Sequence, residues 1–213
     1  MTNPVTGEYH ASAGTSVLVG AFFIYQSKLR SNMVKFKPAI ISVEPLLTIE
    51  ECNNLIVLFE ERSTRPSKVG DEIVSYRKSE AMVLDPLEQQ QIYKKIESYA
   101  RDINEANWDY DLKSMGKLQF IRYPVGGHYD WHLDIGGGHN QLRKLSIIIL
   151  ISPKNDFVGG DLIIKNSSED TVIPLKQGQV VSFPSFMLHK VVPVANGVRY
   201  VLVGWVVGDR PFR

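Results

Sequence analysis

The sequence is poor in three features that would each have pointed to a class of protein. It has a single cysteine, Cys52, so no internal disulfide can form and a disulfide-stapled secreted scaffold is excluded. It has no excess of charge of one sign, with 24 Lys and Arg against 23 Asp and Glu. A general nucleic-acid binder usually shows a clear basic excess, so we expect no nucleic-acid partner. A reducing cytoplasm is the predicted compartment.

The chain also lacks an apolar run long enough to cross a membrane. Residues 17–25 form the candidate run, but a spanning helix needs roughly 20 such residues. A secretory signal would carry Lys or Arg before the run, whereas Lys28 and Arg30 follow it. We therefore expect no membrane association, and interpret the run as a buried strand or as a subunit contact that would support a homo-oligomer. Alternatively, the functional product starts at Met33, where a compact domain pattern begins.

Two helices are predicted in the first half of the chain. Thr48 and Glu51 have the spacing of a capping box, and apolar residues recur at helical intervals from there to Phe59. Cys52 falls on that apolar face, so it is interpreted as a packed core thiol rather than a nucleophile. The second helix is expected to have Asp85 as its N-cap, with the proline that follows at the first helical position.

From residue 117 onward, short β-rich runs alternate with clusters of Gly, Pro, Asn and Asp. Many short strands with such punctuation are typical of a sandwich or barrel. The predicted fold is mostly β with flanking helices (α+β), a jelly roll with two N-terminal helices packed on one face. Residues 1–34 are expected to be an N-terminal extension of unknown role. A single domain is expected over residues 35–213, with a helical support region at 35–116 and a core at 117–213. The predicted strands are residues 38–43, 118–123, 145–151, 161–164, 180–183 and 200–207.

A candidate metal site lies in the β-rich half. His132 and Asp134 are two positions apart, so a strand would present them on the same face. His189 follows a buried strand and a turn, and offers a second imidazole from a distant part of the chain. Two imidazoles and one carboxylate form the facial triad of non-haem Fe(II) oxygenases, which leaves coordination positions open. Arg199 begins the next predicted strand in an apolar setting, where unpaired charge is costly, so we expect it to bind an anion.

Residues 117–213 resemble the prolyl-4-hydroxylase-like branch of the 2-oxoglutarate- and Fe(II)-dependent dioxygenases. Six stretches match in the family's order, whereas residues 36–116 match only loosely and residues 1–34 match nothing. The stretches are residues 122–126 (RYPVG), 132–134 (HLD), 143–146 (RKLS), 158–162 (VGGDL), 183–189 (FPSFMLH) and 192–205, the last from VPV through GVR to a tryptophan.

The resemblance implies a double-stranded β-helix, a cupin-like jelly roll, with Fe(II) at its open end bound by His132, Asp134 and His189. Arg199 would pair with the distal carboxylate of the cosubstrate 2-oxoglutarate, and Tyr123 would donate a hydrogen bond nearby. Residues 35–213 would then be a single catalytic domain of an oxidoreductase that hydroxylates an unactivated C–H bond with O2. Succinate and CO2 would be released, and ascorbate is an optional reductant. The expected substrate is proline, in a peptide or protein or as the free amino acid.

Other interpretations of this site stay open. The substrate could be another amino-acid side chain or a small molecule. A non-catalytic, metal-bound jelly-roll binding module is a candidate from a different class, although the complete set of three metal ligands and a buried arginine argues against it. Nucleic-acid dealkylation is disfavoured by the neutral charge of the chain.

A second H-x-D pair, His128 and Asp130, stands four residues before the first. If the strand is unbroken, its alternation would put all four side chains on one face, and a metal would accept either pair. The stretch that begins at Tyr123 lies at the family's distance from His132, and the glycine loop after Asp134 would let the chain turn away at the barrel mouth. Both arguments favour the later pair.

Two features beside the site have alternative interpretations. Residues 64–80 are predicted to be a substrate lid, with a solvated loop as the alternative. Tyr129 either lines the substrate channel or packs within the fold. The basic residues of the predicted lid are Arg65, Lys68, Arg77 and Lys78.

Overall fold

The computed structural model describes residues 40–62, 65–66, 75–166 and 168–212. The predicted N-terminal extension, its apolar run at residues 17–25 and the alternative start at Met33 all lie outside the described residues. No helix within the described ranges is both long enough and apolar enough to cross a membrane.

Helix α2 (Ile49–Glu61) begins at the predicted capping box. The backbone N–H of Glu51 donates to the hydroxyl of Thr48 (3.1 Å), and the N–H of Thr48 donates to the Glu51 carboxylate (2.7 Å). The helix turns Cys52, Leu55 and Phe59 inward. The cysteine is therefore a buried core thiol, as its position on the apolar face predicted.

Helix α3 (Gln90–Asn107) starts later than the prediction from Asp85 placed it. The Asp85 carboxylate accepts from the backbone N–H groups of Leu87 (2.7 Å) and Glu88 (3.4 Å), so it caps a turn that precedes the helix. That turn satisfies the Asp85 side chain before the helix proper begins. The predicted helix is therefore present, but its start was wrong.

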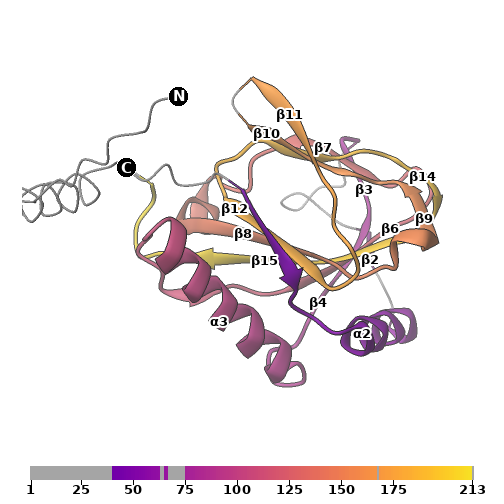
Figure 1. Ribbon diagram of the computed structural model, residues 1–213, viewed down its shortest axis with the longest axis horizontal. Helices are drawn as coiled ribbons and strands as arrows, with labels where there is room; N and C mark the ends of the chain where they lie inside the picture. Colours follow the sequence, from indigo (N-terminus) through magenta and orange to yellow (C-terminus); the bar gives the residue numbers. More distant parts are fainter. Residues whose placement is uncertain (1–39, 63–64, 67–74, 167, 213) are drawn as a thin grey trace, which may run out of the picture. The chain divides into compact units, whose positions relative to one another are not determined.

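The strands form two antiparallel sheets and a short two-stranded ribbon (Figure 1). The larger sheet has the order β1-β12-β8-β15-β6-β4-β2, with β5 paired to β15, and the smaller sheet has the order β11-β10-β13-β7-β3. The larger sheet contains β1 (Ile41–Pro45), β2 (Arg65–Pro66), β4 (Glu80–Val83), β5 (Ser114–Met115), β6 (Gln119–Tyr123), β8 (Arg143–Leu150), β12 (Gln179–Pro184) and β15 (Arg199–Val207). The smaller sheet contains β3 (Arg77–Lys78), β7 (His128–His132), β10 (Leu162–Asn166), β11 (Glu169–Ile173) and β13 (His189–Val191), and the ribbon contains β9 (Phe157–Gly159) and β14 (Val194–Gly197). Two 3-10 turns, η1 (Gly138–Leu142) and η2 (Lys154–Asp156), complete the elements.

The larger sheet is covered on both faces, and strand β8 shows why. Its residues alternate between two cores, because successive side chains of a strand point to opposite sides. Leu145, Ile147 and Ile149 face the helices, and Ile148 and Leu150 face the smaller sheet. The sequence of a strand buried on both faces is therefore a continuous apolar run, without alternation of apolar and polar residues.

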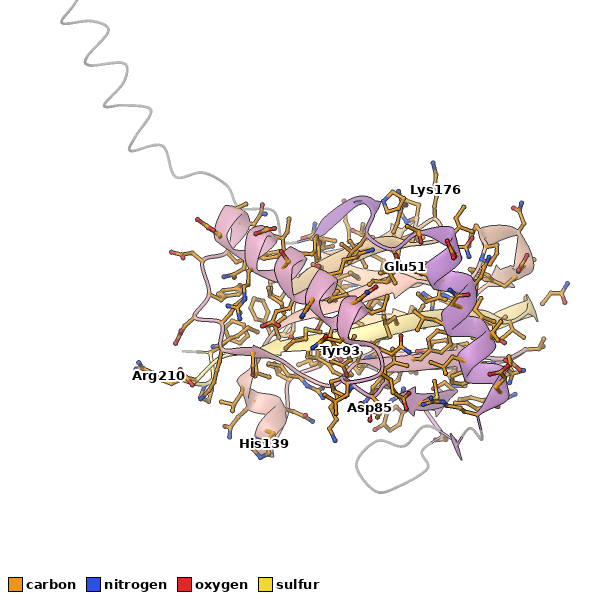
Figure 2. The ribbon with its side chains drawn as sticks, turned by 90° about the horizontal axis from the view of Figure 1, so that it is seen from below. Glu51, Asp85, Tyr93, His139, Lys176 and Arg210 are labelled. Atoms are coloured by element: carbon orange, nitrogen blue, oxygen red, sulfur yellow. The ribbon has the colours of Figure 1, made fainter. Side chains whose placement is uncertain are left out.

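The helices pack against the outer face of the larger sheet (Figures 1 and 2). Tyr93 on α3 joins the two layers, because its hydroxyl donates to the carbonyl of Leu84 (3.0 Å) and accepts from the N–H of Leu118 (2.8 Å). The inner faces of the two sheets enclose the second core. The predicted architecture, a jelly roll with two helices on one face, is confirmed.

Candidate active site

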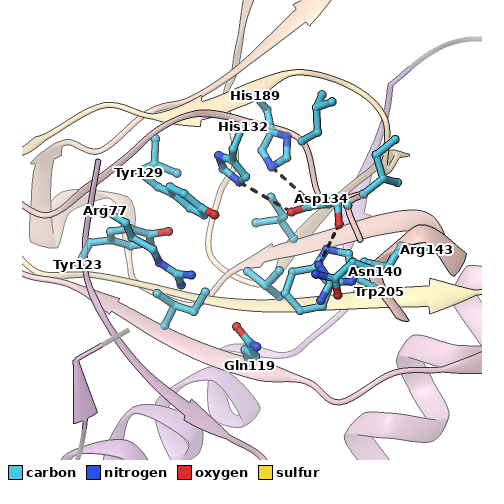
Figure 3. Close-up of a pocket in the computed structure, with 17 residues that line it drawn as sticks. Arg77, Gln119, Tyr123, Tyr129, His132, Asp134, Asn140, Arg143, His189 and Trp205 are labelled. Carbon is cyan, nitrogen blue, oxygen red and sulfur yellow. Dashed lines mark hydrogen bonds and ion pairs between the residues drawn. The ribbon is translucent and has the colours of Figure 1, made fainter. Parts of the chain in front are cut away.

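Three side chains with metal-ligating atoms meet between the two sheets, as Figure 3 shows. His132 ends β7, His189 begins β13, and the two residues are direct cross-strand partners. Asp134 follows two residues after His132. Nε2 of His132 lies 3.7 Å from Oδ1 of Asp134, and Nε2 of His189 lies 3.5 Å from Oδ2. One ligand atom from each residue lies within 4.8 Å of the other two, so the group could hold a metal ion.

Both imidazoles are held with Nε2 toward this space. Nδ1 of His132 lies 2.8 Å from the carbonyl oxygen of Asp130, and Nδ1 of His189 lies 2.9 Å from that of Met187. A carbonyl only accepts, so in each neutral ring Nδ1 is the donor and Nε2 keeps its lone pair. Such backbone bonds to the outer nitrogen are usual for metal-binding histidines.

The charge state of the group suits a metal. Burial, together with the neighbouring His189, lowers the pKa of His132 to about 4, so this imidazole is neutral at physiological pH. Burial alone would raise the pKa of Asp134, but His189 and His132 outweigh it and hold the pKa of that carboxyl below its ordinary value. The Ser146 hydroxyl acts in the same direction by donating to Oδ2 of Asp134 (2.6 Å).

A β-bulge separates the two H-x-D pairs. Val191 pairs with Tyr129 and His189 pairs with His132, so two steps along β13 match three along β7. Tyr129 and His132 therefore face the same side, and the alternation assumed for an unbroken strand does not hold. His128 instead bonds through Nδ1 to the carbonyl of Gly126 (2.9 Å). Asp130 is exposed, and its carboxylate accepts from the next backbone N–H (2.8 Å). Neither residue of this earlier pair lines the pocket beside the metal-ligating group.

A cavity of about 450 Å³ adjoins the three ligands. The sequence left open whether Tyr129 lines the channel or packs within the fold, and it does both. It lines this cavity, and its ring packs on that of His132 with centroids 3.5 Å apart and planes 13° from parallel. Burial raises the pKa of Tyr129 to about 12, so its hydroxyl stays protonated. The lining residues are Arg77, Gln119, Ile121, Tyr123, Tyr129, His132, Leu133, Asp134, Ile135, Gly136, Asn140, Arg143, Ile148, His189, Val191, Val203 and Trp205.

Arg199 lies next to this cavity but does not line it. It is the direct partner of Tyr123 across β15 and β6, and its guanidinium carbon is 5.5 Å from the Tyr123 ring centroid. Tyr123 lines the cavity, whereas Arg199 does not. Arg199 is only 3% exposed, and its Nη1 has no hydrogen-bond partner among the described residues. An unpaired buried guanidinium nitrogen fits an anion, which is the role expected from the sequence.

Several residues that shape the site were not expected from the sequence. Arg143 stacks on Trp205, with 3.8 Å from guanidinium carbon to ring, and donates from Nη1 to the backbone carbonyl of Asp134 (2.9 Å). Ser146 could have been noticed, because it is the polar residue inside the otherwise apolar run of β8. The partners of Arg143 could not have been predicted, because Trp205 lies on β15, far along the chain, and Asp134 lies beyond the end of β7.

The predicted lid is described only in part. Residues 64 and 67–74, with Lys68, lie outside the described residues, and so does the side chain of Arg65. Of the two remaining basic residues, Arg77 lines the cavity, whereas Lys78 donates from Nζ to the carbonyl of Val125 (3.1 Å) and does not line it.

Comparison with known proteins identifies the family. The family model of the 2OG-Fe(II) oxygenase superfamily matches residues 118–207. A PKHD-type hydroxylase of Synechococcus sp. strain CC9605 is 40% identical over 96 residues, which cover 45% of this chain and 43% of the relative. One of Idiomarina loihiensis is 32% identical over 140 residues, covering 64% and 58%. The chain thus spans less than two thirds of the length of these relatives.

Solved structures agree on the fold. A prolyl-4-hydroxylase of Pseudomonas putida superposes with a TM-score of 0.66 at 20% identity, covering 80% of this chain and 93% of that one. A prolyl hydroxylase of Trichoplax adhaerens, in complex with a peptide of hypoxia inducible factor, gives a TM-score of 0.70 at 17% identity, covering 88% and 93%. Residues 118–207 belong to the 2OG-Fe(II) oxygenase superfamily, whose name gives its cosubstrate and its metal, and the predicted family is confirmed.

Proposed function

We propose that this member of the 2OG-Fe(II) oxygenase superfamily is a hydroxylase that requires Fe(II), 2-oxoglutarate and O2. The observation that carries the proposal is the convergence of two imidazole Nε2 atoms and one carboxylate within 4.8 Å, beside a cavity of about 450 Å³. This donor set is that of the facial triad, which binds Fe(II) and leaves positions for ligands that react.

His132, Asp134 and His189 would hold the metal. Bound Fe(II), with 2-oxoglutarate and O2, supplies the chemistry that inserts one oxygen atom into a C–H bond and releases succinate and CO2. The chain's own part is to hold the ligands in place through backbone carbonyls and Ser146, and to keep the reacting space dry. The lowered pKa of His132 keeps that imidazole neutral, so it needs no deprotonation before it binds metal.

Arg199 would bind the distal carboxylate of 2-oxoglutarate, with Tyr123 as the neighbouring donor. Arg199 is buried, its Nη1 has no hydrogen-bond partner among the described residues, and it lies beside Tyr123, which lines the cavity. Burial raises the pKa of Tyr123, which keeps its hydroxyl protonated and able to donate. A guanidinium and a phenol together satisfy a carboxylate.

Proline, in a peptide or protein or as the free amino acid, is the substrate that we propose, with another amino-acid side chain or a small molecule as the alternative. Support comes from the two solved neighbours, which are named prolyl hydroxylases, one of them bound to a peptide. We place the activity in the cytoplasm, because the free, buried Cys52 is compatible with a reducing compartment. A non-catalytic binding module would not need an unpaired buried arginine beside an intact triad.

A succinate-release screen tests the proposal. Purified protein with Fe(II), 2-oxoglutarate and O2, with and without ascorbate, is offered proline-containing peptides, free amino acids and methylated oligonucleotides. We expect succinate release to rise with a proline-containing substrate, and mass spectrometry to find one added oxygen atom in it. His189→Ala is the control that should abolish both. Absence of Fe(II)-dependent 2-oxoglutarate consumption with every substrate would favour the binding module instead.

A further inference from the structure

Arg77 is a cation on the cavity wall that neither the metal nor the cosubstrate accounts for. It begins β3, the edge strand of the smaller sheet, and its direct partner on β7 is Tyr129. The bulge in β7 puts Tyr129 on the same side as His132. Strand register therefore places Arg77 on the same face of the sheet as the tyrosine and the candidate metal ligand.

The guanidinium of Arg77 is held in position by its neighbours, and no carboxylate of the described residues neutralises it. Its carbon lies 4.6 Å from the ring centroid of Tyr129, and its Nε donates to the hydroxyl of Ser79 (3.0 Å). These contacts orient the group and leave its two terminal amino groups for a ligand. Among the residues that the structure describes, no carboxylate forms an ion pair with Arg77.

The other two arginines near the cavity have different tasks. Arg143 stacks on Trp205 and bonds to a backbone carbonyl, so its guanidinium is already engaged. Arg199 lies beside Tyr123, outside the cavity lining. Figure 3 shows Arg77 reaching into the cavity beside Tyr123 and Tyr129, on the opposite side from Arg143.

With Fe(II) and 2-oxoglutarate bound, the site would still carry a net positive charge that an additional anion could neutralise. Asp134 is the carboxylate on the described cavity wall, and it faces the two imidazoles. With the proposed function, the positive charges of Fe(II) and Arg199 match the negative charges of Asp134 and the 2-oxoglutarate dianion. Among the described residues, Arg77 and Arg143 then remain as cations without a matching anion beside the reacting space. Arg143 is held by Trp205 and a backbone carbonyl, so Arg77 is the one with terminal amino groups left for a ligand, and a partly buried cation favours an anionic partner.

We propose that Arg77 binds a carboxylate of the substrate, so that the substrate is a small carboxylic acid, such as a free amino acid, rather than an internal residue of a polypeptide. This inference rests on the proposed function and decides between two of its substrates. The planar guanidinium grips the carboxylate through two parallel hydrogen bonds and turns the rest of the molecule toward His132.

Matched acids and amides test this assignment without turnover. The protein is loaded with Zn(II), which is redox-inactive, and then with 2-oxoglutarate, and both steps are followed by calorimetry. L-proline and L-prolinamide are titrated next, followed by cyclopentanecarboxylate and cyclopentanecarboxamide. The members of each pair have the same ring and differ at the carboxyl group. A charge-assisted hydrogen bond predicts that an acid binds about 10- to 150-fold more tightly than its amide.

Two variants complete the design. Arg77→Gln should remove the preference for the acid and leave the affinity for 2-oxoglutarate unchanged. Lys78→Gln removes the neighbouring cation, which does not line the cavity, and should keep the preference. The proposal is overturned if no acid binds more tightly than its amide, or if the preference survives Arg77→Gln. A loss of 2-oxoglutarate affinity in Arg77→Gln would instead make Arg77 the cosubstrate ligand. Failure of the proposed function would appear earlier, as absent binding of Zn(II) or 2-oxoglutarate to the wild-type protein.

Discussion

Replacing Arg199 by Met should stabilise the ligand-free protein while it weakens cosubstrate binding. Met is similarly long but carries neither charge nor donors. In the wild type, Nη1 of Arg199 is buried without a partner among the described residues, and such a group costs about 1–3 kcal/mol. Loss of the guanidinium next to the Tyr123 ring costs about 0.5–1 kcal/mol. The free energy of unfolding should therefore rise by up to about 2.5 kcal/mol.

When 2-oxoglutarate is present, the variant should instead be less stable than the wild type. The cosubstrate's carboxylate would pair with Arg199 in a buried setting, and removing one member of such a pair costs about 2–5 kcal/mol. The affinity for 2-oxoglutarate should fall roughly 30- to several-thousand-fold. The affinity for the metal should stay nearly constant, because Arg199 contacts none of the three ligands. Ligand binding then stabilises the wild type but not the variant.

Thermal unfolding of the Zn(II)-loaded proteins, with and without 2-oxoglutarate, measures both effects. For a domain of this size each kcal/mol shifts Tm by about 2–4 °C. The variant should melt up to about 10 °C above the wild type without cosubstrate, and below it at saturating cosubstrate. If the variant without 2-oxoglutarate melts at a lower temperature than the wild type, Arg199 has a structural partner. Unchanged 2-oxoglutarate affinity would remove Arg199 from the site.

Three further predictions follow from the site and the domain boundary. His132→Ala should abolish Fe(II)-dependent succinate formation, whereas His128→Ala should keep most of it, and the opposite result at matched iron and 2-oxoglutarate would move the metal to the earlier pair. Ser146→Ala should raise the pKa of Asp134. The carboxylate form is present above its pKa and lost as pH falls through it, so Zn(II) affinity in the variant should begin to fall at a higher pH, and superimposable pH profiles would contradict this. Deleting residues 1–32 should leave metal binding and uncoupled 2-oxoglutarate turnover intact, and an insoluble or metal-free product would show that the predicted domain boundary is wrong.

The parts of the fold that depend on local sequence could be predicted. The capping box at Thr48 and Glu51 needs only neighbouring residues, and it is present. The H-x-D spacing of His132 and Asp134 gave a correct expectation of proximity, although Asp134 lies just beyond the end of β7. The start of α3 was wrong because Asp85 caps a turn instead, a choice between two local structures that use the same side chain.

The parts that depend on strand pairing could not be predicted. The bulge in β7 is visible only in its register with β13, and it decides that Tyr129 rather than His128 shares a side with His132. Arg77 reaches the site because β3 pairs with β7, a pairing that no spacing in the sequence indicates. Ser146 stands out in the sequence as a polar residue inside an apolar run, but its partner Asp134 follows only from the way the strands pack.

The two walls of the cavity differ in how easily they open. Ser146, which bonds to Asp134, sits on β8, a strand flanked by β12 and β15 and buried on both faces. The backbone amide hydrogens of β8 should exchange with solvent only when most of the domain unfolds. Arg77 sits on a two-residue strand at the edge of the smaller sheet, where few backbone bonds must break for local opening. The ligand Asp134 is therefore held by the part of the domain that opens last, whereas the candidate substrate anchor Arg77 can detach while the bond between Ser146 and Asp134 stays in place.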